Sequence, residues 1–478
     1  MLKKIFIGFG VLLLILIISG AALWQARKSD YVKQVVVEQV ASHVTHNDNE
    51  TALIQAALGF GAPQTYLLVF LNNTELRPGG GFIGAYGVVT IDHAVPHILK
   101  VEGTEILDNL APKNFPSVPP KPMKDYLRVE RWNFRDSNWS PDFVLSSQKS
   151  LDLYTKEQGL AAKDIAGIIG FTPTLVENIL KLTGPITVDG EVFDSNNFTE
   201  KLEYEVEYGY AEKGKDFDQR KKILSDLGPI LIDRLKITAV THLSDYLALI
   251  EKMVAEKQLM AYSLDPNTQA ALDKRGVTGR MAETTGDYLL WADANLASLK
   301  TDVVMKRKLG YTLVATSTNR VVATASMTYN HTGTINWRIS RYQTYARIFV
   351  PLGSKLLSVT SVSSRGAVSS TSTADTGVEN GHTWFGAPLL VEPKSTAELR
   401  FQYVLPGAVA QSISNGTYTL YAQKQLGTID NGLTVTGYFG RNVQSATPGE
   451  LPKNYGDTRY DIATDLTVDR TFTVTLQP

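Results

Sequence analysis

The first hydrophobic pattern in the chain is an unbroken apolar run from Ile5 to about Trp24, preceded by two lysines and followed by an arginine and a lysine. Roughly twenty apolar residues suffice to cross a bilayer as a helix. The lysines ahead of the run place the N-terminus in the cytoplasm by the positive-inside rule. We therefore expect a cytoplasmic tip and one retained transmembrane helix in residues 1–28, with the bulk of the chain extracytoplasmic. The alternative is a cleaved signal peptide, for which "SGAA" is a weak cleavage site.

Residues 29–62 carry helical patterns. "DYVKQVVVEQVASHV" is amphipathic, and "ETALIQAALGF" predicts a shorter helix after a polar break. We expect a helical stalk here.

Residues 63–300 mix strand and helix patterns. Apolar runs in "YLLVFL", "FIGAYGVVTID" and "PHILKVEGTEI" predict three successive strands. A proline-rich loop at 110–122 comes next, then a helix after Ser140-Pro141-Asp142, a strand at "IAGIIGF" and a helix begun by Thr172-Pro173. Residues 197–299 show mainly helical patterns. Together these predict an α/β (α+β) domain whose mixed sheet is covered by helices.

From residue 301 onward the pattern changes to short alternating runs rich in threonine, valine, serine and tyrosine. Examples are "NRVVATASMTYNHTG" and the final "RTFTVTLQP". Regular strand-and-turn spacing of this kind is typical of an all-β sandwich. We expect an immunoglobulin-like sandwich at 301–478.

The amino-acid composition excludes several classes of function and of site. Hydrophobic residues make up 43% of the chain, and 47 basic side chains balance 48 acidic ones, which argues against a nucleic-acid partner. The chain has no cysteine, so disulfides, thiolate zinc sites and cysteine nucleophiles are excluded. Any ligand site must be local.

One candidate site is "FLNNTELRPGGGFIG", where an arginine precedes three glycines between two predicted strands. A guanidinium beside bare backbone N–H groups can bind an anion. The alternative is a tight connection with a close neighbour above the glycines. The ligand-binding candidates in this stretch are Asn73, Glu75, Arg77, Gly79 and Gly80.

A second candidate site is "RVERWNFRDSNWSPDF", where arginines stand beside tryptophans. An indole face stacks on apolar sugar faces, and a guanidinium clamps oxyanions. The ligand-binding candidates here are Arg131, Trp132, Arg135, Asp136 and Trp139. Asp136 and Asp142 are candidate ligands for a hard cation. Alternatively, Asp142 caps the next helix and Asp136 pairs with Arg135.

The motifs "FLNNTELRPGGGFIGAYG", "FRDSNWSPDF", "GIIGFTPTLVENILKLTGPITVDG", "YLLWADANLASLKTD" and "YTLYAQKQLGT" occur in the order expected of a bacterial family, domain of unknown function 4012. The chain resembles that family from about Tyr66 to its C-terminus. The family has no established activity, so the resemblance implies an architecture only.

More distantly, the order of strands and helix is similar to the core of LytR-CpsA-Psr enzymes. That resemblance implies transfer of a polyprenyl-pyrophosphate-linked glycopolymer to the cell wall, with arginines on the pyrophosphate and an aspartate-held Mg²⁺. The chain departs from that family by having Gly80 and Gly81 in place of an aspartate, and Gly103-Thr104 in place of an arginine-aspartate pair. Only Arg77 and the pair Arg135-Asp136 stand near the matching places.

These observations favour a membrane-anchored envelope protein that binds envelope glycan or a lipid-linked glycan precursor without turnover. One alternative is a Mg²⁺-dependent glycopolymer phosphotransferase. Another is a structural adhesion or assembly subunit that meets protein partners through the sandwich. The residues themselves fix no cofactor.

Overall fold

The structure is a computed structural model that describes residues 48–112, 114–239, 241–316, 320–451 and 454–477. The expected transmembrane helix and the first stalk helix lie outside these residues. None of the helices in the described part of the chain combines the length and hydropathy that a bilayer crossing requires.

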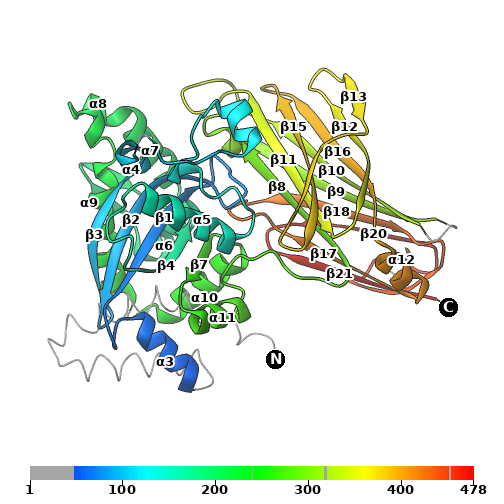
Figure 1. Ribbon diagram of the computed structural model, residues 1–478, viewed down its shortest axis with the longest axis horizontal. Coiled ribbons are helices and arrows are strands. Elements are labelled where there is room, and N and C mark those ends of the chain that lie inside the picture. The colour runs from blue at the N-terminus through cyan, green and yellow to red at the C-terminus, as the bar shows by residue number, and fades with distance from the viewer. Residues whose placement is uncertain (1–47, 113, 240, 317–319, 452–453, 478) are drawn as a thin grey trace. The chain divides into compact units, whose positions relative to one another are not determined.

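The chain divides into two compact units and passes between them more than once (Figure 1). Of the described residues, the first unit comprises those from Asp48 to Asn72 together with those in the ranges Gly79–Val118 and Arg131–Arg280. The second comprises Asn73–Pro78, Pro119–Glu130 and Met281–Pro478. Two short segments from the first third of the sequence therefore fold with the C-terminal part.

The first unit is built on a five-stranded sheet with the order β3-β2-β1-β4-β7. Strand β1 pairs antiparallel with β2 and parallel with β4, so the sheet is mixed, as the sequence predicts. The strands are β1 (Gln64–Asn72), β2 (Phe82–Asp92), β3 (Val95–Gly103), β4 (Ile165–Phe171) and β7 (Leu259–Ser263), and a separate hairpin joins β5 (Ile186–Val188) to β6 (Glu191–Phe193).

Helices cover both faces of this sheet. On one face, α5 packs its Phe143 against Gly170 of β4, where an added Cβ would lie 2.5 Å from the ring. On the other face, Tyr66 and Ile169 share a buried cluster with side chains of α3, α6, α10 and α11. The helices are α3 (Asp48–Ala57), α4 (Thr104–Leu110), α5 (Phe143–Lys156), α6 (Pro173–Thr183), α7 (Phe198–Tyr204), α8 (Tyr210–Glu212), α9 (Lys222–Ala239), α10 (Leu243–Ala255) and α11 (Pro266–Lys274).

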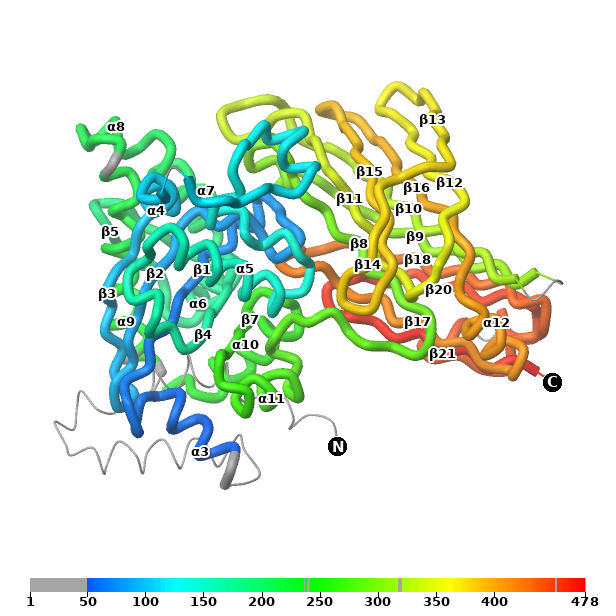
Figure 2. Tube along the Cα trace, viewed as in Figure 1, coloured from blue at the N-terminus to red at the C-terminus, as the bar shows by residue number. Residues whose placement is uncertain are grey.

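The second unit contains two seven-stranded sheets, which run from green to red along the trace in Figure 2. The sheet orders are β13-β12-β16-β10-β9-β18-β20 and β14-β15-β11-β8-β17-β21-β19. Side chains from both sheets, such as Trp291 and Phe401 with ring centroids 5.6 Å apart, form one large apolar core. The expected sandwich-like arrangement is therefore present.

The elements of the second unit, in chain order, are β8 (Asp287–Asn295), β9 (Met305–Ala315), β10 (Val321–His331), β11 (Tyr342–Pro351), β12 (Lys355–Val362), β13 (Val368–Thr371), β14 (Asp375–Glu379), β15 (His382–Val391), β16 (Thr396–Val404), α12 (Gly407–Ser414), β17 (Thr417–Gln423), β18 (Asn431–Tyr438), β19 (Val443–Thr447), β20 (Arg459–Asp465) and β21 (Arg470–Leu476).

The expectation of mainly helical structure over 197–299 is wrong at β7 and β8. Every residue of β8 is buried, so the side chains on both faces of this strand are covered by other parts of the protein. A strand buried on both faces reads as a continuous apolar run without alternation, which periodicity alone does not separate from a helix. Strand β7 is likewise largely buried, and it follows α10 after a short turn.

Candidate ligand site

The segment Asn73–Pro78, the first candidate stretch, is part of the second unit. The Asn73 side-chain amide donates to the carbonyl oxygen of Gly427 at 3.0 Å. The backbone N–H of Leu76 donates to the carboxylate of Asp302 at 2.9 Å. These bonds hold the segment among residues that follow it by more than two hundred positions.

Arg77 is the anchor of this segment, and its side chain is 2% exposed. One guanidinium nitrogen donates to the carbonyl oxygen of Asn295 at 2.6 Å, and another lies 3.2 Å from Glu75. Lys300 approaches the second oxygen of Glu75 at 2.9 Å. Burial alone would raise the pKa of Glu75, but the charges of Lys300 and Arg77 outweigh it and lower the pKa. These contacts of Arg77 therefore stabilise the interior of the second unit.

Behind this anchor lies a buried charge network. Arg307 donates through Nε to Asp293 at 3.1 Å and also pairs with Asp302. Gln425 donates to the carbonyl oxygens of both Arg77 and Asp293. Residues from the three motifs "NNTELRP", "YLLWADANLASLKTD" and "YTLYAQKQLGT" thus meet in one hydrogen-bonded core of the second unit.

The glycines that follow Arg77 belong to the first unit, and close contacts within that unit explain why they carry no side chain. The N–H of Gly79 donates to the carbonyl oxygen of Asn138 at 3.0 Å, and a Cβ on Gly79 would lie 2.8 Å from that oxygen. The Asn138 amide donates to the carbonyl oxygen of Gly81 at 2.6 Å. Gly80 and Gly81 have φ values of 117° and 145°, which favour glycine. This geometry agrees with the second interpretation of the glycines, a tight connection with a close neighbour above them.

The aromatic and arginine residues of the second candidate stretch contact one another and their own unit. Arg131 stacks over Phe115 at 5.3 Å from the ring centroid. The indole N–H of Trp132 donates to the carbonyl oxygen of Asp136 at 2.8 Å, and Lys149 lies 4.5 Å from the Trp132 ring centroid. One face of this indole is therefore already occupied by a cation.

Arg135 ends on a buried pair of carboxyl groups. Its Nε donates to Asp108, and Glu157, which is fully buried, accepts from the N–H of Phe134 at 2.8 Å. Burial, followed by the charge of Asp108, raises the pKa of Glu157 to about 8. Burial likewise raises the pKa of Asp108, against the lowering effect of the Arg135 charge, so this pair of carboxyl groups favours the protonated form more than exposed carboxyl groups do.

Asp142 has the capping role that the sequence left open. It is fully buried, and its Oδ1 accepts from the N–H groups of Val144 and Leu145 at 2.9 and 3.1 Å, which begins α5. Asp136 is buried in a single 3₁₀ turn, and Trp139 is half-buried. Across the described ranges no group of three or more histidine or acidic side chains is placed to hold a metal ion. The carboxylate of Asp142 is used in the cap of α5, and the Mg²⁺ role of Asp136 and Asp142 stays a prediction.

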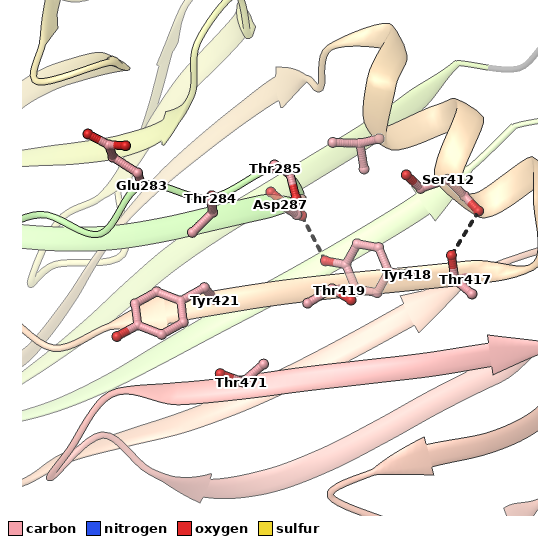
Figure 3. Close-up of a pocket in the computed structure, with 12 residues that line it drawn as sticks. Glu283, Thr284, Thr285, Asp287, Ser412, Thr417, Tyr418, Thr419, Tyr421 and Thr471 are labelled. Atoms are coloured by element: carbon pink, nitrogen blue, oxygen red, sulfur yellow. Dashed lines mark hydrogen bonds between the residues drawn. The ribbon is translucent and has the colours of Figure 1, made fainter. Parts of the chain in front are cut away.

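A pocket that the sequence did not predict lies at the start of β8 in the second unit, with a volume of about 500 Å³ (Figure 3). The chain segment before β8 forms one wall, strand β17 forms another, and α12 lies at one end. A second hollow of about 240 Å³ shares residues 283–286. The lining residues of the larger pocket are Glu283, Thr284, Thr285, Gly286, Asp287, Val409, Ser412, Thr417, Tyr418, Thr419, Tyr421 and Thr471.

The pocket lining is rich in hydroxyl groups and contains no lysine, arginine or histidine. Asp287, only 1% exposed, accepts from the hydroxyl groups of Tyr418, at 2.7 Å, and of Tyr311. Burial raises the pKa of Asp287 to about 6 against the lowering effect of these bonds. The Tyr421 ring lies near-parallel to that of Tyr288, with centroids 6.3 Å apart. The pocket combines aromatic surface with hydroxyl groups and two acidic residues, Glu283 and Asp287.

Glycine at position 286 lets the pocket wall approach β17. A Cβ on Gly286 would lie 2.8 Å from the carbonyl oxygen of Thr419. The signal in the sequence was the alternating threonines of "TYTLYAQ" and "RTFTVTL". The pairing of β17 with both β8 and β21 is not visible before folding.

Three solved structures show weak likenesses to this chain. A protein from Legionella pneumophila, named as a candidate nutrient-binding protein, is 9% identical over 40% of this chain and 70% of its own, with a TM-score of 0.25. A Streptococcus agalactiae protein is 12% identical over 50% and 81%, with a TM-score of 0.29. An M1 zinc metallopeptidase from Deinococcus radiodurans is 10% identical over 36% and 42%, with a TM-score of 0.19. At these scores none indicates a shared function.

The search of curated proteins found no match. Residues 61–207 match the family described as "Protein of unknown function (DUF4012)". This match covers β1 to α7 of the first unit and the segment Asn73–Pro78. The match contains the first three of the five motifs, so the resemblance to this family is confirmed over residues 61–207 and stays a prediction from there to the C-terminus.

Proposed function

We propose that this protein is a single-pass protein of the cell membrane, with its N-terminus in the cytoplasm, whose extracytoplasmic part binds envelope glycan without turnover. The proposal of an anchor rests on the apolar run that begins at Ile5 and on the lysines ahead of it. The binding role rests on the pocket between the start of β8 and β17.

The hydroxyl-rich, cation-free lining of that pocket is the observation that carries the proposal. Sugars offer many hydroxyl groups and apolar ring faces, so they suit a surface of threonines beside a tyrosine ring. Tyr421 supplies that ring, and its hydroxyl is fixed by a 2.7 Å bond to Asp469. A ring held in place loses little entropy when a sugar stacks on it.

The phosphotransferase alternative has less support. Its two arginines are used internally, because Arg77 donates to Asn295 and Arg135 to Asp108. A kinship of the first unit with LytR-CpsA-Psr enzymes, and an immunoglobulin-like class for the sandwich, remain proposals that rest on the order of elements alone. The adhesion alternative rests on the sandwich-like sheets.

Sedimentation with envelope preparations tests the proposal. Full-length protein in detergent is mixed with a washed envelope fraction from the source cells, and the pelleted share is measured. We expect pelleting, and we expect Tyr421→Ala to reduce it at least tenfold. Tyr438→Ala is the matched control, because Tyr438 is an exposed tyrosine on β18 outside the pocket.

The proposal fails if wild-type protein stays in the supernatant with every envelope fraction. Membrane topology is tested separately, by adding protease to intact cells. We expect the part after residue 28 to be cleaved from outside, and full protection would contradict the extracytoplasmic placement.

A further inference from the structure

The outer face of strands β17, β21 and β19 continues the hydroxyl lining of the pocket. Cross-strand pairs on this face are Thr417 with Thr475, Thr419 with Thr473, and Tyr421 with Thr471. Strand β19 adds Ser445 beside Thr475 and Thr447 beside Thr473. We call these eight residues the threonine face.

The alternation along each strand fixes which side chains point outward. Tyr418 and Leu420 of β17, and Phe472 and Val474 of β21, are buried in the core of the unit. Their neighbours in the threonine face are exposed or half-buried. Since side chains alternate across a strand, the hydroxyls stand in rows about 4.8 Å apart across the strands and about 6.8 Å apart along them.

The face and the pocket are continuous. Thr417, Thr419, Tyr421 and Thr471 line the pocket and also belong to the threonine face, as Figure 3 shows for the two strands. A ligand seated in the pocket would therefore meet further hydroxyls if it extended across the sheet. This favours a chain of sugars over a single small molecule.

The charge of the site selects among such chains. No member of the threonine face is ionised at neutral pH, and the pocket adds only two acidic residues, Glu283 and the buried Asp287. An anionic chain would lose water from its charges without a cation to pair with them. A neutral chain exchanges hydroxyl–water bonds for hydroxyl–hydroxyl bonds at no such cost.

We propose that the threonine face, with the pocket at its edge, binds an uncharged extended polysaccharide of the envelope. This inference rests on the proposed glycan-binding function and specifies its ligand class and its surface. Exposed threonines also arise from β-propensity alone, so the test must remove hydroxyls without changing the strands.

The test measures binding of full-length protein in detergent to two polysaccharide fractions released from the source envelope. Anion exchange separates them into an unretained neutral fraction and a retained acidic fraction. The double variant Thr419→Val with Thr473→Val removes a cross-strand pair of hydroxyls and keeps β-branched side chains. Its matched control is Thr312→Val with Thr324→Val, a cross-strand pair of half-buried threonines between β9 and β10 on the other sheet.

We expect wild type to bind the neutral fraction at least tenfold more tightly than the acidic one. The Thr419/Thr473 variant should lose at least tenfold in affinity, and the Thr312/Thr324 variant should stay within twofold of wild type. Neutral binding that both variants retain would overturn the threonine face and leave the glycan-binding function standing. Preference for the acidic fraction would overturn the neutral ligand class. No binding to either fraction would overturn both proposals.

Discussion

Replacing Arg77 by alanine would test whether the segment Asn73–Pro78 is a structural part of the second unit. The substitution removes the charge-assisted bond to the Asn295 carbonyl and the contact with Glu75. It leaves Glu75 with Lys300, 2.9 Å away. The site therefore loses a buried cation but keeps one partner for the carboxylate.

The expected cost follows from these contacts. A hydrogen bond to a charged group contributes about 1.5–3 kcal/mol, and breaking a buried ion pair costs about 3–5 kcal/mol when the remaining charge is left alone. Because Lys300 still balances Glu75, we expect a loss of about 3 kcal/mol in the free energy of unfolding. Arg77→Lys should lose less, because it keeps the charge but not the planar fork of donors.

Arg400 provides a matched control. It pairs with Glu398, two positions earlier, just as Arg77 pairs with Glu75, but its side chain is 47% exposed. Exposed pairs contribute about 0–1 kcal/mol, so Arg400→Ala should stay near wild type. Urea unfolding near pH 7, followed by near-ultraviolet circular dichroism of the buried tyrosines, measures both variants. Equal losses for Arg77→Ala and Arg400→Ala would refute the anchoring role.

Three further predictions concern buried groups. The pKa of Asp287 in the folded state is raised to about 6, so the folded state holds this proton more tightly than the unfolded state does. The free energy of unfolding should therefore fall by about 3 kcal/mol as pH rises from about 4 to about 6. Asp287→Asn should lack this fall, and a variant with the same pH dependence as wild type would contradict the prediction. The pKa of Glu157 is also raised in the folded state, so the free energy of unfolding should fall as pH rises from about 4.5 toward 8. Glu157→Gln should therefore be more stable relative to wild type at alkaline pH than at acidic pH in urea unfolding. Gly79→Ala places a Cβ 2.8 Å from the Asn138 carbonyl oxygen and should cost about 1–3 kcal/mol, whereas Gly61→Ala, with open space around it, should be near neutral by thermal unfolding.

Local patterns in the sequence predicted most single elements of the first unit. The strand "IAGIIGF" is β4 residue for residue, and the helix expected after Ser140-Pro141-Asp142 is α5 with Asp142 as its cap. These elements are specified by neighbours in the chain, through turn residues and capping side chains. Strand β8 was not predicted, because both of its faces are buried and it lacks the alternation of polar and apolar residues that indicates a strand.

The candidate sites depended on long-range pairing, which local patterns do not contain. Arg77 stands beside glycines in the sequence and so indicated an anion site, but its partner Asn295 lies more than two hundred positions away. The pocket at Asp287 likewise needs the parallel pairing of β8 with β17. The sequence did show short alternating runs rich in threonine. That these threonines are exposed and lie together on β17, β21 and β19 appears only in the structure.

The most direct test of the central claim, non-catalytic glycan binding through the second unit, is a calorimetric titration of full-length protein in detergent. The ligands are the neutral envelope polysaccharide and a polyprenyl-pyrophosphate-linked glycan, each with and without Mg²⁺. We predict binding heat with the neutral polysaccharide that does not depend on Mg²⁺ and is lost in Tyr421→Ala. Heat only with the pyrophosphate-linked glycan, dependent on Mg²⁺ and abolished by Arg135→Ala, would contradict the account and favour the phosphotransferase.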